Sequence, residues 1–185
     1  PAPFDRFDKA AMVVGGVALF GWVAMPAAPR AAPLFGALFV VAGALHFVRL
    51  ARWAPDRVWA EKLVAVLHVA YAFIPLGFAL AAASAFTASR AFDMAAIHCW
   101  AIGGIGLMTL AVMTRATRGH TGNALVAPAS TSLLYALLAA AAIARVAAVF
   151  SQGSTVPLTI AGVCWTLAFA GFALLYGPMC LARRQ

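Results

Sequence analysis

Six long apolar runs, separated by short polar segments, constrain this 185-residue chain more than any other feature. A helix needs roughly 20 mostly apolar residues to cross the hydrocarbon core of a bilayer. The runs cover residues 10–25, 33–50, 63–84, 91–114, 131–150 and 156–180 of a single domain, 1–185. They predict an all-α, polytopic membrane protein, built as a bundle of about six transmembrane helices in a lipid bilayer.

The composition agrees with lipid as the solvent of this chain. Apolar residues make up 65% of the chain and charged residues 10%, whereas soluble domains carry about 25% charged residues. The net charge of +8 raises the question of nucleic acid. However, the basic residues lie at the ends of apolar runs and not in clusters with exposed aromatic residues. No nucleic-acid partner is therefore expected.

The basic residues also predict the orientation of the bundle. One side of the predicted membrane has far more of them, namely Arg6, Lys9, Arg49, Arg52, Arg57, Lys62, Arg115, Arg118, Arg183 and Arg184. The other side has only Arg30, Arg90 and Arg145. Loops rich in lysine and arginine stay in the cytoplasm. Both termini are therefore expected on the cytoplasmic side.

Three of the four histidines lie inside predicted spans, where ionisable groups are costly unless they are paired or functional. With a rise of 1.5 Å per residue, His46 lies about 6 Å and His68 about 8 Å inside the cytoplasmic ends of neighbouring antiparallel helices. His98 lies about 10 Å from the opposite end of the fourth span. His46 and His68 can therefore face each other at one depth, far from His98.

A matched pair of imidazoles on adjacent spans is typical of proteins that hold a b-type haem. Helical spacing places Arg49 on the face of His46, and Tyr71 on the face of His68. A cation one turn outward suits haem propionates, and a phenol suits a ligand's second shell. The pattern predicts haem b, with His46 and His68 as iron ligands. The alternative is that each histidine bonds a carbonyl or hydroxyl of a neighbouring helix.

His98 is a separate candidate metal ligand. With Cys99 and Cys164 it supplies the soft donors that copper prefers. Adjacent residues on a helix point about 100° apart, which makes a shared ion difficult for His98 and Cys99. Buried thiols that act as small apolar groups are the simpler interpretation.

The segment that follows the fourth span, TRATRGHTG at 114–122, combines arginines, a histidine and glycines at a helix end. Arg115 and His120 are candidates to bind a cofactor propionate or a lipid headgroup. The alternative is a solvated turn whose arginines only set the topology.

Three segments resemble the NnrS family of bacterial membrane proteins. They are HFVRLARW at 46–53, WAEKLVAVLHVAYAFIPLGFAL at 59–80 and HCWAIGGIGLMTLAVMTRATRGHTG at 98–122. The resemblance runs from about His46 to Arg145, and the glycine-rich span that ends in VMTRATRGHTG is its most specific part.

This resemblance implies a multi-pass protein of the bacterial inner (cytoplasmic) membrane that binds haem and copper. It also implies a role in nitric-oxide metabolism, as in denitrification, or in resistance to nitrosative stress. Members of the family have about twice as many spans, so the chain resembles a C-terminal half or a shortened member. A missing N-terminal half is then a possible partner. Whether the chain catalyses a reaction does not follow from the resemblance.

Two other functions remain open at this stage. A transporter or channel would suit a helix interrupted by Pro75, although no acidic residue lies near the middle of a predicted span. A quinone-reactive subunit similar to cytochrome b would also bind haem.

Overall fold

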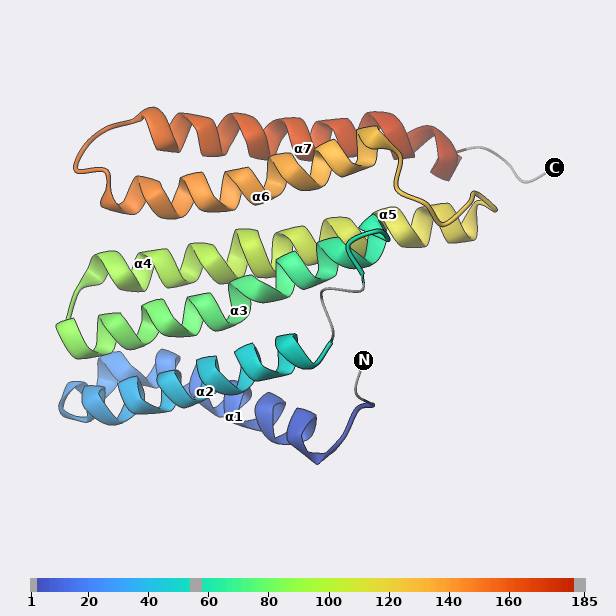
Figure 1. Cartoon of the computed structure of the whole chain (residues 1–185). Helices are drawn as coiled ribbons and strands as arrows, with labels where there is room; N and C mark the ends of the chain where they lie inside the picture. Colours follow the sequence, from blue (N-terminus) through green and yellow to red (C-terminus); the bar gives the residue numbers. More distant parts are fainter. Residues whose placement is uncertain (1–2, 54–57, 182–185) are drawn as a thin grey trace.

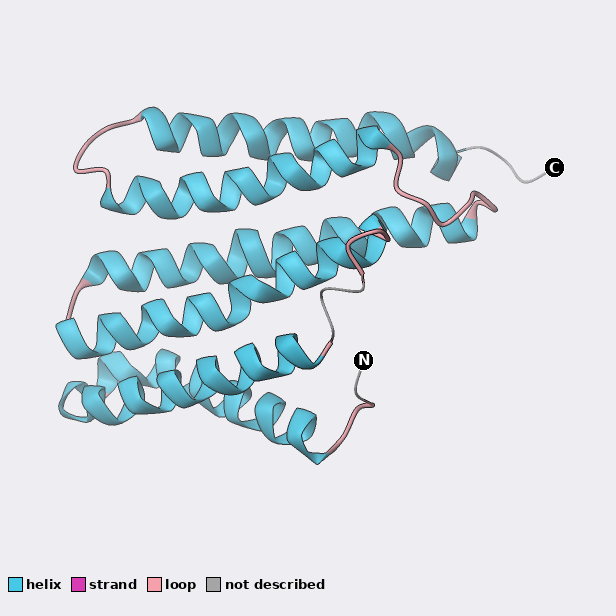
Figure 2. Cartoon of the chain, in the orientation of Figure 1, coloured by secondary structure: helices cyan, strands magenta, loops and turns pink. Residues whose placement is uncertain are grey.

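A computed structural model describes residues 3–53 and 58–181, and within these ranges the chain forms only helices and their connections (Figure 2). The α-helices are α1 (Arg6–Ala24), α2 (Ala32–Arg52), α3 (Lys62–Thr87), α4 (Arg90–His98), α5 (Leu107–His120), α6 (Ala129–Phe150) and α7 (Val156–Leu181). Two short 3-10 turns, Met25–Ala27 and Pro29–Ala31, separate α1 from α2. A π-helix, Cys99–Gly106, joins α4 to α5.

Six of the resulting helical segments are long and apolar enough to span a membrane, as the sequence predicted. They are Arg6–Ala27, Pro29–Arg52, Lys62–Thr87, Arg90–His120, Ala129–Phe150 and Val156–Leu181. The fourth segment continues six residues beyond the predicted end at 114, because no proline or glycine interrupts it before Gly119. Arg115 and His120 therefore lie on a helix and not in a loop.

The spans are arranged as three layers of helix pairs (Figure 1). The α1–α2 pair and the α6–α7 pair lie on opposite sides of a middle layer formed by α3 and the α4–α5 span. Both termini lie at the same end of the bundle. This agrees with six antiparallel spans, while the side of the membrane that this end faces stays a prediction. Arg57, Arg183 and Arg184, which contributed to that prediction, lie outside the described residues.

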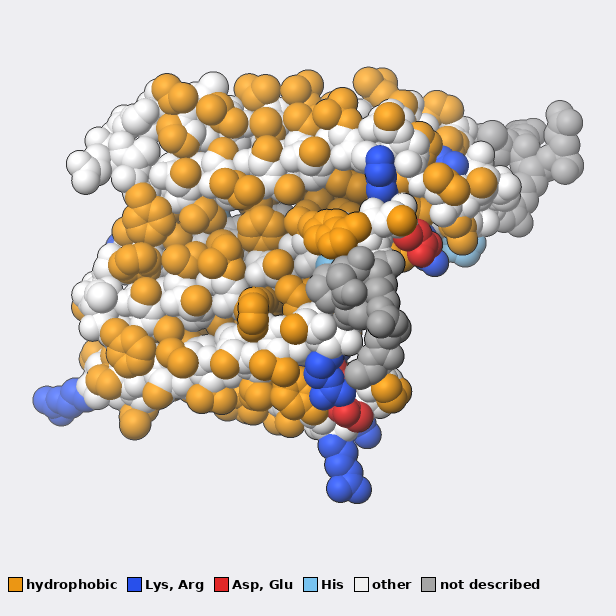
Figure 3. Space-filling view, in the orientation of Figure 1, with side chains coloured by type: hydrophobic (Ala, Val, Ile, Leu, Met, Phe, Trp, Pro, Cys, Tyr) orange, Lys and Arg blue, Asp and Glu red, His pale blue; other side chains and the backbone are white. Residues whose placement is uncertain are grey.

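Charged side chains gather at the end of the bundle that holds the termini (Figure 3). We call this the basic end; its described basic residues are Arg6, Lys9, Arg49, Arg52, Lys62, Arg115 and Arg118. The flanks of the bundle between its two ends are largely apolar (Figure 3). This is the surface expected of a protein in contact with lipid chains.

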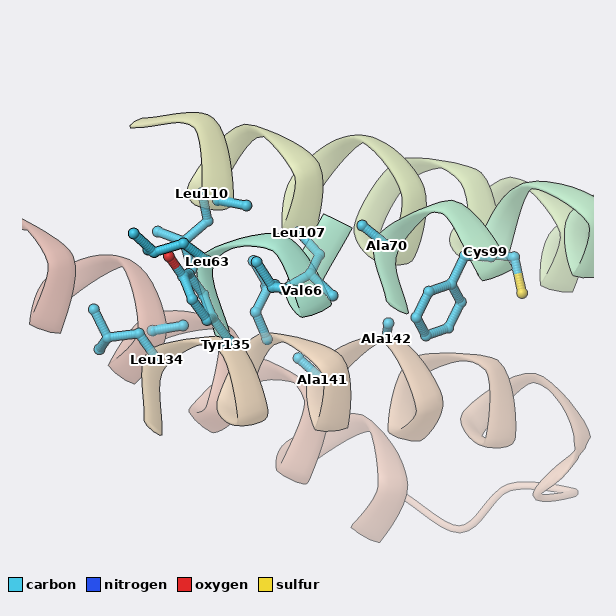
Figure 4. Packing of buried hydrophobic residues seen from close by; sticks show 14 of the residues in the cluster. Leu63, Val66, Ala70, Cys99, Leu107, Leu110, Leu134, Tyr135, Ala141 and Ala142 are labelled. Atoms are coloured by element: carbon cyan, nitrogen blue, oxygen red, sulfur yellow. The ribbon is translucent and has the colours of Figure 1, made fainter. Parts of the chain in front are cut away.

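The main core lies where α3, α5 and α6 meet. Its buried residues include Leu63, Val66, Leu107, Leu110 and Leu138, all of them at most 5% exposed. Figure 4 shows Leu63 and Leu110 close to Tyr135, and Val66, Ala141 and Ala142 farther along the same interface. In an 18-residue apolar stretch of α3, 56% of the residues are buried, whereas in the corresponding stretch of α7 only 11% are buried. The third span is therefore the central helix, and its residues are positioned by neighbours on several sides.

Glycines allow the fourth span to approach α3 closely. A β-carbon added to Gly103 would lie 2.2 Å from Cγ of Phe73, and one on Gly77 would lie 2.1 Å from Nε1 of Trp100. Each helix thus accepts an aromatic ring of the other against its backbone. The Trp100 indole N–H also donates to the backbone carbonyl of Ile74 at 3.2 Å. Both contacts lie in the π-helix, whose small residues permit this packing.

Replacing Gly103 by alanine should destabilise the bundle. Because the nearest atom is at the root of the Phe73 ring, the ring cannot simply rotate away, and overpacking of this kind costs about 1–3 kcal/mol. Thermal unfolding in detergent should show a lower midpoint for Gly103→Ala. The matched control is Gly162→Ala, since a β-carbon at Gly162 meets nothing within 4 Å. Equal midpoints for the two variants would contradict this packing.

Asp5 connects the start of α1 to the end of α2 and should make stability depend on acid pH. It caps α1 through the N–H groups of Phe7 and Asp8, and Arg52 donates to it at 2.5 Å. The bond from Arg52 is the main reason why the pKa of Asp5 lies below its usual 3.8. The carboxylate therefore stabilises the fold above the unfolded-state pKa, and this contribution disappears as pH falls through the lower folded-state pKa.

The variant Asp5→Asn tests this contribution, since asparagine still caps a helix but does not titrate. We expect the wild type to unfold at a higher temperature than Asp5→Asn near neutral pH. The difference should shrink as the pH falls below about 3.8. A constant difference across that range would rule out the Asp5–Arg52 pair as its origin.

Candidate functional site

A buried polar network at the basic end joins the first three spans. Its centre is Arg49 of α2, whose Nε donates to Asp8 of α1 at 2.9 Å. Nη1 of the same side chain donates to the Tyr71 hydroxyl of α3 at 2.8 Å. The Asp8 and Arg49 side chains are only 6% and 14% exposed. The guanidinium also lies over the Trp53 ring, 5.1 Å from its centre. One cation thus ties three helices together in a region with little water.

His46 completes this network from α2. Its Nδ1 lies 2.5 Å from the Tyr71 hydroxyl, and its ring stacks on Phe78 with centres 5.6 Å apart. The opposite nitrogen, Nε2, faces Gly15 of α1 so closely that a β-carbon there would lie 2.4 Å away. His46 is 7% exposed. Both edges of the imidazole are therefore in contact with protein.

The network favours one arrangement of the protons on His46 and Tyr71. A guanidinium can only donate hydrogen bonds, so the Tyr71 oxygen accepts from Arg49. The phenol can donate its own proton to Nδ1 of His46 while its oxygen accepts from Arg49, and this arrangement uses both the donor and an acceptor site of the hydroxyl. In this arrangement neutral His46 carries its proton on Nε2, the nitrogen next to Gly15. This tautomer presents no lone pair outside the network.

His68 has the opposite arrangement. Its Nδ1 lies 3.1 Å from the backbone carbonyl of Val64, which can only accept, so Nδ1 carries the proton. Its Nε2 is buried and has no hydrogen-bond partner in the described part of the chain. The edge of the Trp53 ring packs against the imidazole with centres 5.6 Å apart. His68 thus holds a lone pair on an apolar face of α3, and such a group normally requires a partner.

The two histidines that the sequence placed at one depth are connected through aromatic rings. Trp53 packs on Tyr71 with ring centres 4.6 Å apart and also contacts His68. Tyr71 in turn bonds His46. The structure therefore brings the predicted residues His46, His68, Arg49 and Tyr71 into one region. Tyr71 forms its hydrogen bond with His46 of the neighbouring helix, although the sequence placed Tyr71 on the same helix face as His68.

His98 lies apart from this region, at the last residue of α4 before the π-helix. Its Nε2 is the second buried imidazole nitrogen without a partner among the described residues. Cys99 is fully buried and Cys164 is half-buried. In residues 3–53 and 58–181, no three or more His, Cys, Asp or Glu side chains are grouped closely enough to hold a metal ion. Copper at His98 stays a prediction.

Arg115 and His120 line a shallow pocket of about 410 Å³ at the end of α5. Val112, Gly119 and Leu125 form the rest of its wall together with Ala116. The pocket has none of the residues of the His46–His68 region in its lining. The structure thus places these two predicted residues in one pocket. Their binding of a propionate or a lipid headgroup stays a prediction.

Three residues of the site were missed by the sequence analysis: Asp8, Gly15 and Phe78. Asp8 had a usable signal, because an acid in the first turn of one span faces arginines in the last turn of the next. Gly15 and Phe78 had none, since small and aromatic residues are common throughout these spans. Their contacts with His46 depend on how the helices cross.

Comparison with known proteins gives one match. The profile of the family described as NnrS protein matches residues 1–184, a longer stretch than the motifs that carried the resemblance. No curated protein and no solved structure matches the chain.

Removing the cation of the network should be far more harmful than removing both charges. Arg49→Met removes the closest cation from buried Asp8 and leaves only Arg52, whose Nη2 lies 3.9 Å from the carboxylate. Loss of one partner from a buried pair costs about 3–5 kcal/mol, and the remaining contact with Arg52 places the expected loss at the lower end of this range. The double variant Asp8→Asn with Arg49→Met should recover much of this loss. Unfolding of the wild type, both single variants and the double variant in detergent gives the coupling energy. Additive effects would show that the pair is not a buried unit.

Proposed function

Because this chain belongs to the NnrS family, we propose that it is a membrane protein that binds haem b and acts in nitric-oxide metabolism or resistance to nitrosative stress. The observation that carries the proposal is the state of His68. A buried imidazole nitrogen with a free lone pair is costly in an apolar bundle unless a ligand completes it. Haem iron is such a ligand, and histidine is a common axial ligand for it.

The other nitrogen of His68 strengthens this assignment. Histidines that bind metals nearly always donate their second ring N–H to a carbonyl or carboxylate, which fixes the tautomer and the ring orientation. Nδ1 of His68 has this partner in the Val64 carbonyl. The required geometry therefore comes from a single turn of α3, and a cofactor would need only to approach Nε2.

His46 suits a supporting role better than that of a second iron ligand. Its Nδ1 shares a hydrogen bond with the Tyr71 hydroxyl, and its Nε2 faces Gly15. Ligation through either nitrogen would require one of these contacts to break. In the proposed arrangement His68 holds the iron, while His46 and Tyr71 set the polarity nearby. The bound haem would supply an iron with an open position for nitric oxide.

His98 is the residue that we propose for the second, copper-binding role. Its buried Nε2 has the same unpartnered state as that of His68. Cu(I) prefers soft thiolate or thioether donors, and imidazole also suits copper. Further donors would have to come from a partner, such as additional spans that pack against this chain. Arg115 and His120, which share one pocket, are proposed to meet an anionic group of a cofactor or lipid.

Replacing His68 should remove the haem. The purified wild-type protein should show a Soret band, and His68→Gly should lose it, because the proposed axial ligand is absent. Adding imidazole to His68→Gly should restore the band, since free imidazole fits the space that the side chain vacates. Absorption spectra and haem content per protein measure both effects.

His46→Gln is the matched control, because it removes an imidazole from the adjacent helix. It should keep the haem and only shift the position of the band. Loss of haem in His46→Gln and not in His68→Gly would reverse the assignment. A wild-type protein without haem, purified from cells grown with nitric oxide, would disprove the proposal.

A further inference from the structure

The three tyrosines of the chain are equally protected from water but differ in their hydrogen-bond partners. Tyr71, Tyr135 and Tyr176 are 7%, 6% and 1% exposed. The Tyr135 hydroxyl bonds Thr114, and the Tyr176 hydroxyl bonds Thr131. Only Tyr71 bonds an imidazole. Burial therefore does not distinguish the three phenols, whereas the basicity of the partner does.

The partner decides how easily a phenol can be oxidised. Loss of one electron turns a phenol into a very strong acid, so the proton must leave as the electron leaves. Threonine hydroxyls are too weakly basic to accept it, whereas neutral imidazole is a good acceptor near pH 7. The Tyr71 hydroxyl lies 2.5 Å from Nδ1 of His46, so in the tautomer with the histidine proton on Nε2 the phenolic proton has almost no distance to travel. Arg49 holds the phenolic oxygen in place from the other side.

We propose that Tyr71 is a one-electron donor that reduces nitrogen dioxide to nitrite inside the bilayer. This inference rests on the proposed function, because nitric oxide forms nitrogen dioxide when it meets oxygen. Nitrogen dioxide is a small, neutral radical that dissolves in hydrocarbon, so the burial of Tyr71 does not exclude it. Nitrogen dioxide, unlike water-soluble oxidants, thus reaches a phenol that is 7% exposed.

The step balances in atoms and electrons. Nitrogen dioxide takes one electron from Tyr71 and leaves as nitrite. The O–H bond of Tyr71 breaks, and the proton forms a new N–H bond at Nδ1 of His46. The products are nitrite, a neutral tyrosyl radical and an imidazolium. Arg49, whose guanidinium bonds the phenolic oxygen, places a positive charge near the site where the anion forms.

Trp53 provides the route by which the phenol is restored. Its ring centre lies 4.6 Å from that of Tyr71, and it follows the last residue of α2 at the basic end. An electron from a water-soluble thiol passes through Trp53 to the tyrosyl radical, and His46 returns the proton to the phenolic oxygen. The thiol loses one electron and releases its proton to water, which leaves a thiyl radical, and Tyr71 and His46 regain their starting states.

The experiment compares the tyrosines of the full chain in lipid nanodiscs. Pulse radiolysis of a nitrite solution produces nitrogen dioxide, transient absorption follows the tyrosyl radical, and mass spectrometry locates nitrotyrosine. We expect a radical in wild type, Tyr135→Phe and Tyr176→Phe, but none in Tyr71→Phe. Nitration should concentrate at Tyr71. His46→Gln keeps a hydrogen-bond acceptor but removes the base, so the radical should form about 10²-fold more slowly.

Two further measurements separate this role from a structural one. Radical formation should slow in heavy water for the wild type, because a proton moves with the electron. Trp53→Phe should leave formation unchanged but lengthen the lifetime of the radical in the presence of a thiol. Equal nitration of all three tyrosines, or an unchanged rate in His46→Gln with an unchanged unfolding midpoint, would overturn the proposal.

The same samples distinguish failure of this inference from failure of the proposed function. Protein without haem whose Tyr71 reacts as described would contradict haem binding and support the tyrosine role. Protein with haem whose Tyr71 is inert would do the reverse.

Discussion

Hydrocarbon offers no hydrogen bonds, so every polar group inside the spans must find its partner within the protein. The backbone meets this constraint within each helix, and several polar side chains meet it through partners on other helices, such as Thr131 with Tyr176 and Trp22 with Asp93. These pairs also fix the rotation of each helix, because a small turn would leave two groups unpaired. Among the fully buried side-chain nitrogens and oxygens of the described chain, the two without a hydrogen-bond partner are Nε2 of His68 and Nε2 of His98. In such a background an unpaired nitrogen is an informative observation.

The same constraint indicates where the protons of the site lie. The Val64 carbonyl can only accept, so Nδ1 of His68 carries the proton. Arg49 can only donate, so the Tyr71 oxygen accepts from it and the phenolic proton is available to Nδ1 of His46. This reasoning separates two histidines that look alike in the sequence. His46 is a base held by a phenol, and His68 is a free lone pair. Cofactor binding and proton transfer are thereby proposed for different residues of one site.

The sequence was sufficient for the architecture because lipid imposes a simple rule on length and polarity. Six apolar runs became six spans, and the depth of His46 and His68 followed from the rise of a helix. The direction in which each side chain points around its helix axis was harder to predict. Whether Tyr71 points to His68 on its own helix or to His46 on the next one depends on how α2 and α3 cross. Such crossing angles arise from the packing of many side chains, and a single sequence does not display them.

The limits of sequence reasoning are clearest at the ends of the helices. The last span residue before a polar segment was placed at 114, yet the helix continues to His120, because water at the membrane surface satisfies a helical backbone as well as a loop. Asp8 was overlooked because it lies before the first apolar run. It is nevertheless buried, since Arg49 reaches it across the helix interface.

The π-helix between Cys99 and Gly106 has a consequence for the angular phase of the fourth span. A wider turn of this type amounts to one additional residue in the helical count, and each residue of an α-helix advances by about 100°. Everything that follows is therefore rotated relative to a uniform helical wheel. Leu107, Leu110 and Thr114 face the interior only in this rotated frame. With one residue fewer, the same segment would turn these side chains toward lipid and bring Arg115 toward the core. The π-helix therefore sets which face of α5 is buried.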